Sequence, residues 1–307
     1  MLFDPPTPRA AERYNRKDKV DKDRPSDNPS PDVDVQKSNR GPHTSRELAE
    51  LPRFSANVGL LWPDRPLPRR IEAASKAGFH AIEMQFPYDV PASEVAAVAH
   101  REGLTLLGIN TAVGNFAAGD RGFGALPGRE REFQATVDQA IEYCLGCGAC
   151  AIHPLAGNVA APDRQRARAV FADNLRVAAA KAAIHGLTLL LEPLNPRNNP
   201  DYFYSTLAEA ASLIEELALP NVKLQFDIYH VAISEGDVLT KLKRYMPIIG
   251  NVQIAAVPSR AEPDEGEIAY PAIFSAVDAL GYKGWVGCEY APRGDTDEGL
   301  RWIKPFV

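Results

Sequence analysis

Three carboxylates and one amide stand at or near the ends of short apolar segments in the second half of the chain. They are Glu192 in "LTLLLEPL", Asp227 in "VKLQFDIYH", Gln253 in "NVQIAAV" and Glu289 in "WVGCEY". An ionised carboxylate at the end of a buried strand is costly unless a partner meets its charge. Residues of these types at one place therefore predict a cation between them.

The spacing of the four residues indicates that they lie on successive β-α units. They are separated by 35, 26 and 36 residues, about one strand and one helix each. Hard oxygen ligands favour Mg²⁺ or Mn²⁺ over zinc or copper. For any single one of them, a helix N-cap or a loop hydrogen-bond acceptor is the alternative. Taken together, we predict Glu192, Asp227, Gln253 and Glu289 as the ligands of one divalent metal ion.

Short apolar segments alternate with amphipathic ones from Phe54 to the end of the chain. The predicted strands are 54–61, 81–86, 104–110, 150–157, 187–194, 222–230, 251–257 and 285–290. Strict alternation of strand and helix indicates parallel strands. The first strand lacks the Gly-rich phosphate turn of an open doubly wound sheet. Eight units between residues 53 and 307 match the roughly 250 residues of a (β/α)8 TIM barrel, which places the four polar residues at one mouth.

Residues 1–52 differ in composition from the rest of the chain. They are rich in Pro, Asp, Lys and Ser and show neither helical nor strand periodicity. Such a segment cannot bury enough apolar surface to offset the entropy of ordering it. We expect a disordered or loosely attached N-terminal extension, 1–52, and a barrel domain, 53–307.

The composition excludes several classes of function. The chain has 307 residues, 45% of them hydrophobic, a formal net charge of −6 and a pI near 5.6. An acidic chain without a basic face argues against nucleic acid or an anionic membrane as partner. The sequence contains no apolar run long enough to span a bilayer and no secretory signal. We expect a cytoplasmic protein, and a homo-oligomer is compatible with the sequence.

Three cysteines form a C-x2-C-x2-C run that invites comparison with an iron–sulfur or zinc site. They are Cys144, Cys147 and Cys150. A fourth ligand is missing nearby, and the first two lie on a predicted helix whereas the third opens the next strand. Packing as small apolar side chains is the favoured interpretation.

Further polar residues are predicted to lie around the same mouth. His230 and His153 are candidates for orienting a substrate, and Arg260 is suited to fork onto a substrate carboxylate. Glu267 lies in the same loop as Arg260. Each has a structural alternative, a hydrogen-bonded histidine or a solvated loop charge. Glu83, near the end of a predicted strand, either contributes to the site or pairs with a cation elsewhere in the barrel.

Several segments of the chain resemble those of a known family. From Phe54 to Phe306 it is similar to the xylose-isomerase-like barrels, and within them to the hydroxypyruvate isomerase and 2-oxo-tetronate isomerase group. The matching segments are "FSAN", "AIEMQFPYD", "AAGDRGFGALPGRE", "LEPLN", "FDIYH", "VQIA", "EPDEGEIAYP" and "GWVGCEYAPRG". "INTAVGNFAAG" and "VPSRAEPDEGEIAYPAIF" are closer to the 2-oxo-tetronate branch.

The resemblance implies a metal-dependent isomerase that shifts a carbonyl on a small hydroxy-keto acid through an enediolate. It implies that Glu192 and Glu289 also serve as proton acceptor and donor. It assigns His230 and Arg260 to binding of substrate oxygens, with a small anionic sugar acid as the substrate.

Other functions remain as alternatives at the level of sequence. A ketose 3-epimerase would use the same metal and the same two glutamates. An abasic-site endonuclease would need several zinc ions and a basic groove, which six histidines and an acidic pI disfavour. A Schiff-base aldolase would need a lysine inside the barrel, and Lys223 lies at the wrong end of its strand. A barrel that has lost catalysis and only binds sugars is disfavoured, because it would not need intact metal ligands.

Overall fold

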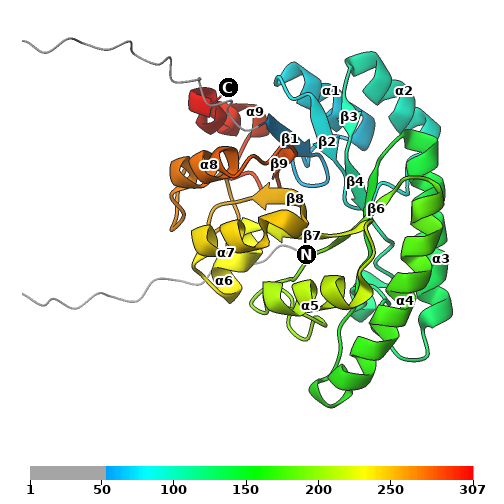
Figure 1. Ribbon diagram of the computed structural model, residues 1–307. Coiled ribbons are helices and arrows are strands. Elements are labelled where there is room, and N and C mark those ends of the chain that lie inside the picture. The colour runs from blue at the N-terminus through cyan, green and yellow to red at the C-terminus, as the bar shows by residue number, and fades with distance from the viewer. Residues whose placement is uncertain (1–52, 307) are drawn as a thin grey trace, which may run out of the picture. The chain divides into compact units, whose positions relative to one another are not determined.

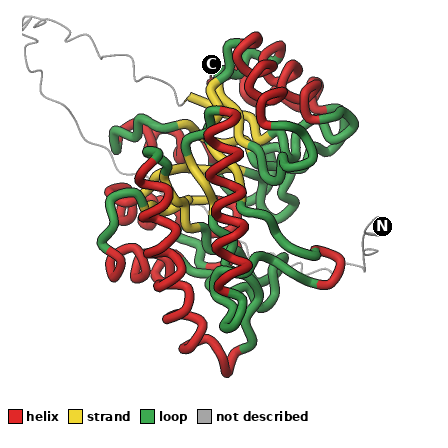
Figure 2. Tube along the Cα trace, turned by 90° about the vertical axis from the view of Figure 1, so that its right-hand side faces the viewer, coloured by secondary structure: helices red, strands yellow, loops and turns green. Residues whose placement is uncertain are grey.

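The computed structural model describes residues 53–306. Residues 1–52, for which a disordered extension is expected, and Val307 lie outside the described residues. In the described part, parallel strands form a barrel that is surrounded by helices (Figure 1). The turned view shows the strands enclosed between helices (Figure 2). The fold is therefore the predicted xylose isomerase-like TIM barrel.

The bounds of the elements follow the chain in alternating order. The strands are β1 (Arg53–Asn57), β2 (Ala81–Glu83), β3 (Thr105–Leu106), β4 (Gly108–Asn110), β5 (Ala151–His153), β6 (Thr188–Leu191), β7 (Val222–Asp227), β8 (Ile249–Ile254) and β9 (Trp285–Cys288). The α-helices are α1 (Leu67–Lys76), α2 (Ala92–Glu102), α3 (Glu130–Cys147), α4 (Arg164–Ile184), α5 (Leu207–Leu217), α6 (Ile228–Ser234), α7 (Val238–Tyr245), α8 (Tyr270–Ala279) and α9 (Thr296–Gly299). Short 3-10 helices are η1 (Phe116–Ala118), η2 (Ala161–Asp163), η3 (Met246–Ile248) and η4 (Leu300–Phe306).

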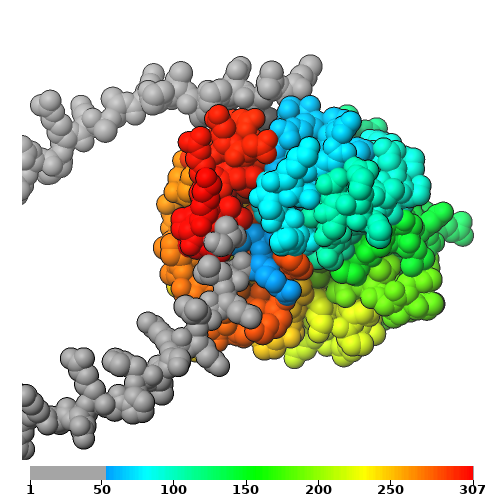
Figure 3. All heavy atoms as spheres, turned by 90° about the horizontal axis from the view of Figure 1, so that it is seen from above, coloured from blue at the N-terminus to red at the C-terminus, as the bar shows by residue number. Residues whose placement is uncertain are grey.

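Eight predicted strands appear as nine because the third is divided at Leu107. Strand β3 pairs with β2, and β4 pairs with β5. The barrel closes across the break, where Leu107 N donates to Ile82 O and Met84 N donates to Gly108 O. Elsewhere neighbours in sequence are neighbours in the sheet, and β9 pairs with β1. In the space-filling view, the red C-terminal segment lies beside the blue start of the barrel (Figure 3).

Side-chain alternation along the strands separates the apolar layer from a polar barrel interior. In β7, Leu224 and Phe226 are buried on the face toward the helices, whereas Gln225 and Asp227 point into the barrel. In β8, Val252 alternates in the same way with Gln253. The fold thus buries its apolar core between strands and helices and leaves the barrel interior to hydrogen-bonding side chains.

The predicted strands ran too far at their C-terminal ends. The segment 222–230 stops being a strand at Asp227, whose Oδ1 accepts a hydrogen bond from Tyr229 N and caps α6. His230 therefore lies on α6 and not on a strand. Asp and Asn are good N-caps because their short side chains reach the free amides of the first turn.

The cysteine run does not converge. Cys144 and Cys147 are buried on α3, as the packing interpretation expects, whereas Cys150 is exposed next to β5. The interpretation is therefore wrong for Cys150, whose Sγ faces Leu107 O at 3.1 Å. Among the described residues, no helix is both long enough and apolar enough to cross a membrane.

Candidate active site

The register of the last strands brings the four predicted ligands to one mouth of the barrel. Asp227 is the register partner of Gln253, and Gln253 is the partner of Gly287, two residues before Glu289. Glu192 directly follows β6, where Pro193 ends the strand. All four side chains are buried.

Glu192 and Glu289 each have one carboxylate oxygen held by amide donors. Gln225 Nε2 donates to Glu192 Oε2 at 2.7 Å. Gln85 Nε2 and Asn57 Nδ2 donate to Glu289 Oε1 at 2.8 and 3.2 Å. Because each amide fixes one oxygen, the other oxygen of each carboxylate is turned in a defined direction, Oε1 of Glu192 and Oε2 of Glu289.

Asp227 and Gln253 also each have one polar side-chain atom held by a hydrogen bond. Asp227 Oδ1 caps α6 through Tyr229 N at 2.8 Å, and Gln253 Nε2 donates to Glu83 Oε2 at 2.7 Å. Their remaining oxygens, Asp227 Oδ2 and Gln253 Oε1, are buried and make no hydrogen bond with any described residue. Three of the four predicted ligands thus keep an oxygen without a hydrogen bond from the described residues, whereas Oε2 of Glu289 accepts one from Arg260 Nη2 at 3.3 Å.

The charges at the site are unbalanced. Burial raises the pKa of Glu192 to about 8, and the nearby Glu289 adds to the shift. Burial and Glu289 also raise the pKa of Asp227 well above its usual value. Burial alone would lower the pKa of Arg260, but the three carboxylates raise it. Three carboxylates and one guanidinium give an excess of two negative charges when the carboxyls are ionised.

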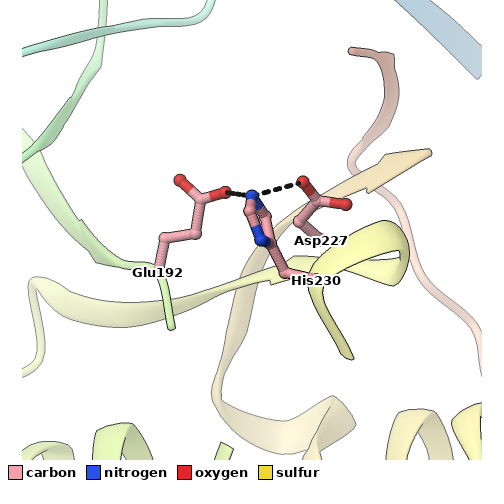
Figure 4. Close-up of side chains that lie close together, drawn as sticks. All are labelled: Glu192, Asp227 and His230. Carbon is pink, nitrogen blue, oxygen red and sulfur yellow. Dashed lines mark ion pairs between the residues drawn. The ribbon is translucent and has the colours of Figure 1, made fainter. Parts of the chain in front are cut away.

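His230 presents one particular ring nitrogen to the carboxylates. Its Nδ1 accepts a hydrogen bond from Asn195 N at 2.9 Å, so the neutral ring carries its proton on Nε2. Nε2 lies 3.6 Å from Asp227 Oδ2 and 3.8 Å from Glu192 Oε1 (Figure 4). Burial lowers the pKa of His230 well below its usual value, which keeps the ring neutral.

This tautomer determines what His230 can do. Glu192, Asp227 and His230 offer atoms within 4.8 Å of one another, a spacing compatible with metal ligation. A ligating Nε2 would need a free lone pair and would move the proton to Nδ1, where Asn195 N already donates. His230 is therefore arranged as a hydrogen-bond donor to a bound molecule and not as a metal ligand.

His153 lies on the opposite side of Glu192. Its Nδ1 is 3.0 Å from Glu192 Oε2, but neither ring nitrogen makes a well-directed hydrogen bond with a described residue. Burial lowers the pKa of His153 to about 4, so the contact is not an ion pair at neutral pH. The structure brings His153 to the site without fixing its role.

Arg260 and Glu267 share a loop but not a location. Arg260 Nη2 lies 3.3 Å from Glu289 Oε2, and its guanidinium stacks over the ring of Tyr229 at 5.1 Å. Its Nε is buried and makes no hydrogen bond with a described residue. The side chain of Glu267 is exposed, and residues 53–306 provide it with no hydrogen bond or salt bridge. The structure therefore joins Arg260 to the site, and a role of Glu267 in substrate binding stays a prediction.

The donor set fits a hard divalent cation. The oxygens without a hydrogen bond from the described residues are Glu192 Oε1, Asp227 Oδ2 and Gln253 Oε1, and Glu289 adds Oε2, which accepts from Arg260 Nη2. They match the oxygen ligands preferred by Mg²⁺ and Mn²⁺, and two positive charges would neutralise the excess. Amide donors on the second oxygen of a ligand are also the usual means of orienting it.

The supporting amides were missed at the level of sequence. Gln225, Gln85 and Asn57 hold the two glutamates, and Ser55 and Asn251 hold Glu83. A signal was present, because polar residues at every second position of an apolar strand mark a polar face. "VKLQFD" and "NVQI" carry this alternation, whereas the predicted ligands lie at or near the strand ends.

The family follows from comparison of the whole chain with known proteins. A family model described as xylose isomerase-like TIM barrel matches residues 71–306. The chain belongs to this family. It is 46% identical to the 2-oxo-tetronate isomerase of Cupriavidus necator over 84% of this chain and 99% of the relative. It is 42% identical to the putative hydroxypyruvate isomerase of Homo sapiens over 83% of this chain and 95% of the relative.

A solved structure agrees with the fold. The crystal structure from Brucella melitensis titled AP endonuclease, family 2 superposes with a TM-score of 0.81 at 42% identity. It covers 83% of this chain and 99% of that one. This structure supports the fold, and the curated relatives place the chain in the hydroxypyruvate and 2-oxo-tetronate isomerase group, so it is an isomerase.

Proposed function

We propose that the chain isomerises a small hydroxy-keto acid of the 2-oxo-tetronate or hydroxypyruvate class, with Mg²⁺ or Mn²⁺ as cofactor. The observation that supports the proposal is the set of four buried oxygen-bearing side chains at one mouth, each with one polar atom held by a neighbour, with Arg260 bonded to Glu289 Oε2. The names of the relatives support the substrate class.

The reaction requires a proton to move between adjacent carbons. A carboxylate removes the proton from the carbon that bears the hydroxyl, and an enediolate forms as the carbonyl becomes an oxyanion. A proton returns to the former carbonyl carbon, the proton of the hydroxyl passes to the oxyanion, and the former hydroxyl becomes the new carbonyl. Glu192 and Glu289 are assigned as the acceptor and donor, because both are buried at the mouth and come from separate strands.

Other residues bind the substrate and limit its orientation. A bound divalent cation would supply Lewis-acid stabilisation of the developing oxyanion. His230 Nε2 donates a hydrogen bond to a substrate oxygen, as its tautomer allows. Arg260 pairs with the substrate carboxylate through guanidinium donors, of which Nε has no other partner.

Proton NMR in D2O tests the proposed function directly. The protein is incubated with hydroxypyruvate, 2-oxo-tetronate or a ketohexose, each with Mg²⁺ or Mn²⁺. Isomerisation of a keto acid with solvent deuterium at the carbon that receives the proton supports the proposal. Turnover of the ketohexose alone, with inversion at its C3, would replace it by the 3-epimerase alternative.

Arg260→Met should weaken binding of an acid substrate more than it slows turnover. Loss of a hydrogen-bonded charge costs about 1.5–3 kcal/mol, so KM should rise about tenfold to a hundredfold. Steady-state kinetics checks this value, with Arg293→Met as the control, since Arg293 pairs with Glu262, Asp264 and Glu265 on the loops. An equal KM for both variants would remove the carboxylate contact from the proposal.

Stabilisation by Mn²⁺ should grow with pH. The pKa of Glu192 is raised to about 8 from a usual value of 4.5, so the metal-free folded state holds a proton that the unfolded state releases between these values. The metal-free protein therefore loses stability as pH rises through this window. A cation must displace that proton, so its thermal shift increases from about pH 6 to about pH 8. Scanning fluorimetry with and without Mn²⁺ measures it, and a shift independent of pH would contradict the assignment.

A further inference from the structure

Glu83 is a buried carboxylate that the proposed reaction does not use. It ends β2, and its side chain points into the barrel, where all three of its partners are donors. Ser55 Oγ donates to Oε1 at 2.7 Å, while Gln253 Nε2 and Asn251 Nδ2 donate to Oε2 at 2.7 and 3.3 Å. No positively charged side chain among the described residues contacts Glu83. The prediction that Glu83 pairs with a cation elsewhere in the barrel therefore finds no partner among them.

The contact with Gln253 settles which way its amide faces. Gln253 Nε2 donates to Glu83 Oε2 at 2.7 Å, which places the NH₂ group of Gln253 on the side of Glu83. The amide oxygen Oε1 must then point away from Glu83, and it is buried without a protein partner. The reversed amide would place two oxygens against each other. A negative charge behind the NH₂ group also polarises the amide and increases the electron density on Oε1.

The space around Glu83 and Gln253 is tight on the side of Gly287 and open on the side of a cavity. A Cβ at Gly287 would collide with Glu83 Oε1 and lie 3.0 Å from Gln253 Cγ. An interior cavity of about 440 Å³ is lined by Glu83, Asn251 and Gln253, among others. Without Glu83, the side chain of Gln253 would therefore be free to rotate toward the cavity.

We infer that Glu83 is a positioning residue that holds the Gln253 amide with its oxygen directed at the cation site. The inference rests on the proposed function, since it assigns to Gln253 Oε1 the role of metal ligand. Glu83 acts through Gln253 and touches neither substrate nor cation. Hydrogen-bond partners that orient a metal ligand typically contribute 10–100-fold to affinity.

Mn²⁺ affinity tests the inference without any measurement of activity. Titration of the full chain with Mn²⁺, followed by electron paramagnetic resonance of free ion, is done for wild type, Glu83→Ala and Glu83→Gln. We expect Glu83→Ala to weaken binding about 10–100-fold. Glu83→Gln should retain most of the affinity, because its amide oxygen can still accept from Gln253. Glu262→Ala is the matched control, a buried glutamate that bonds Arg293, and should bind like wild type.

A double-mutant cycle separates positioning from general damage. In a Gln253→Ala background, Glu83→Ala should cause no further loss of affinity, because the group that it positions is gone. An equal loss in both backgrounds, or wild-type affinity in Glu83→Ala, would overturn the inference. Should Glu83→Ala fail to fold, Glu83→Asp, whose shorter side chain withdraws the carboxylate from Gln253, must give the same dependence on Gln253.

The proposed site and the inference can fail separately. Asp227→Asn removes a proposed ligand directly and should reduce Mn²⁺ binding whether or not Glu83 has a role. Wild-type binding by Asp227→Asn would reject the site and the inference with it. Loss of binding by Asp227→Asn with no effect of Glu83→Ala would reject the inference alone.

Discussion

Glu192→Gln and Glu289→Gln should each lower kcat by about 10²–10⁴-fold while the barrel stays folded. Glutamine keeps the length of the side chain and an amide oxygen for the donors that already hold it, Gln225 at position 192 and Gln85 at position 289. It cannot accept and return a proton. Neither substitution adds volume to the buried site, and each removes a buried carboxyl whose ionisation is costly.

Isotope exchange in D2O measures the lost step for each variant. With both carboxylates intact, solvent deuterium enters substrate and product, whereas a variant without its proton acceptor shows no exchange at the hydroxyl-bearing carbon. Circular dichroism and Mn²⁺ titration serve as controls for folding and for the cation. Substantial turnover by the double variant Glu192→Gln, Glu289→Gln would exclude both residues from proton transfer.

Asp227→Asn should have opposite effects on the metal-free and the metal-loaded protein. Asparagine is as good an N-cap as aspartate, so α6 still begins at Ile228. The substitution removes one of the clustered carboxyls whose pKa is raised by burial and by Glu289, so the metal-free protein gains stability at neutral pH. A direct ligand matters more than the neighbours that orient it, so Mn²⁺ affinity should fall by more than about 100-fold.

Thermal denaturation with and without Mn²⁺ checks this change of sign. Without metal, the Tm of Asp227→Asn should exceed that of the wild type. At a Mn²⁺ concentration that saturates the wild type, the Tm of Asp227→Asn should be the lower of the two. Asp227→Ala provides the comparison, because it loses both the cap and the ligand and should be less stable than Asp227→Asn under both conditions. If the Tm of metal-free Asp227→Asn lies below that of the metal-free wild type, the clustered carboxyls do not destabilise the metal-free protein.

The fold could be predicted because its signals are local and repeated. Alternation of apolar strands with amphipathic helices, over about the length of a TIM barrel, decided the architecture. The strand ends could not be fixed in the same way, because "FDIYH" is apolar enough to continue as a strand. The hydrogen bond from Tyr229 N to Asp227 Oδ1 ends it there, and a cap depends on geometry that periodicity does not encode.

The candidate site could be predicted only where a residue type was unusual for its place. Glu192, Asp227 and Glu289 are charges at the ends of apolar strands, so each needed an explanation. Gln225 and Asn251 lie inside strands and are uncharged, and their partners come from neighbouring strands. Such pairings depend on the stagger of the barrel, which no single segment of sequence reveals.

The two oxygens of Asp227 link a helix start to the mouth of the barrel. Oδ1 caps α6, and Oδ2 lies 3.6 Å from His230 Nε2 on the side of Glu192, so one side-chain torsion sets both. Rotation of this side chain would loosen the first turn of α6, and His230 lies in that turn. Binding of a cation at the mouth is thus coupled, through Asp227, to the direction of the His230 imidazole. A longer Glu at position 227 would remove this coupling.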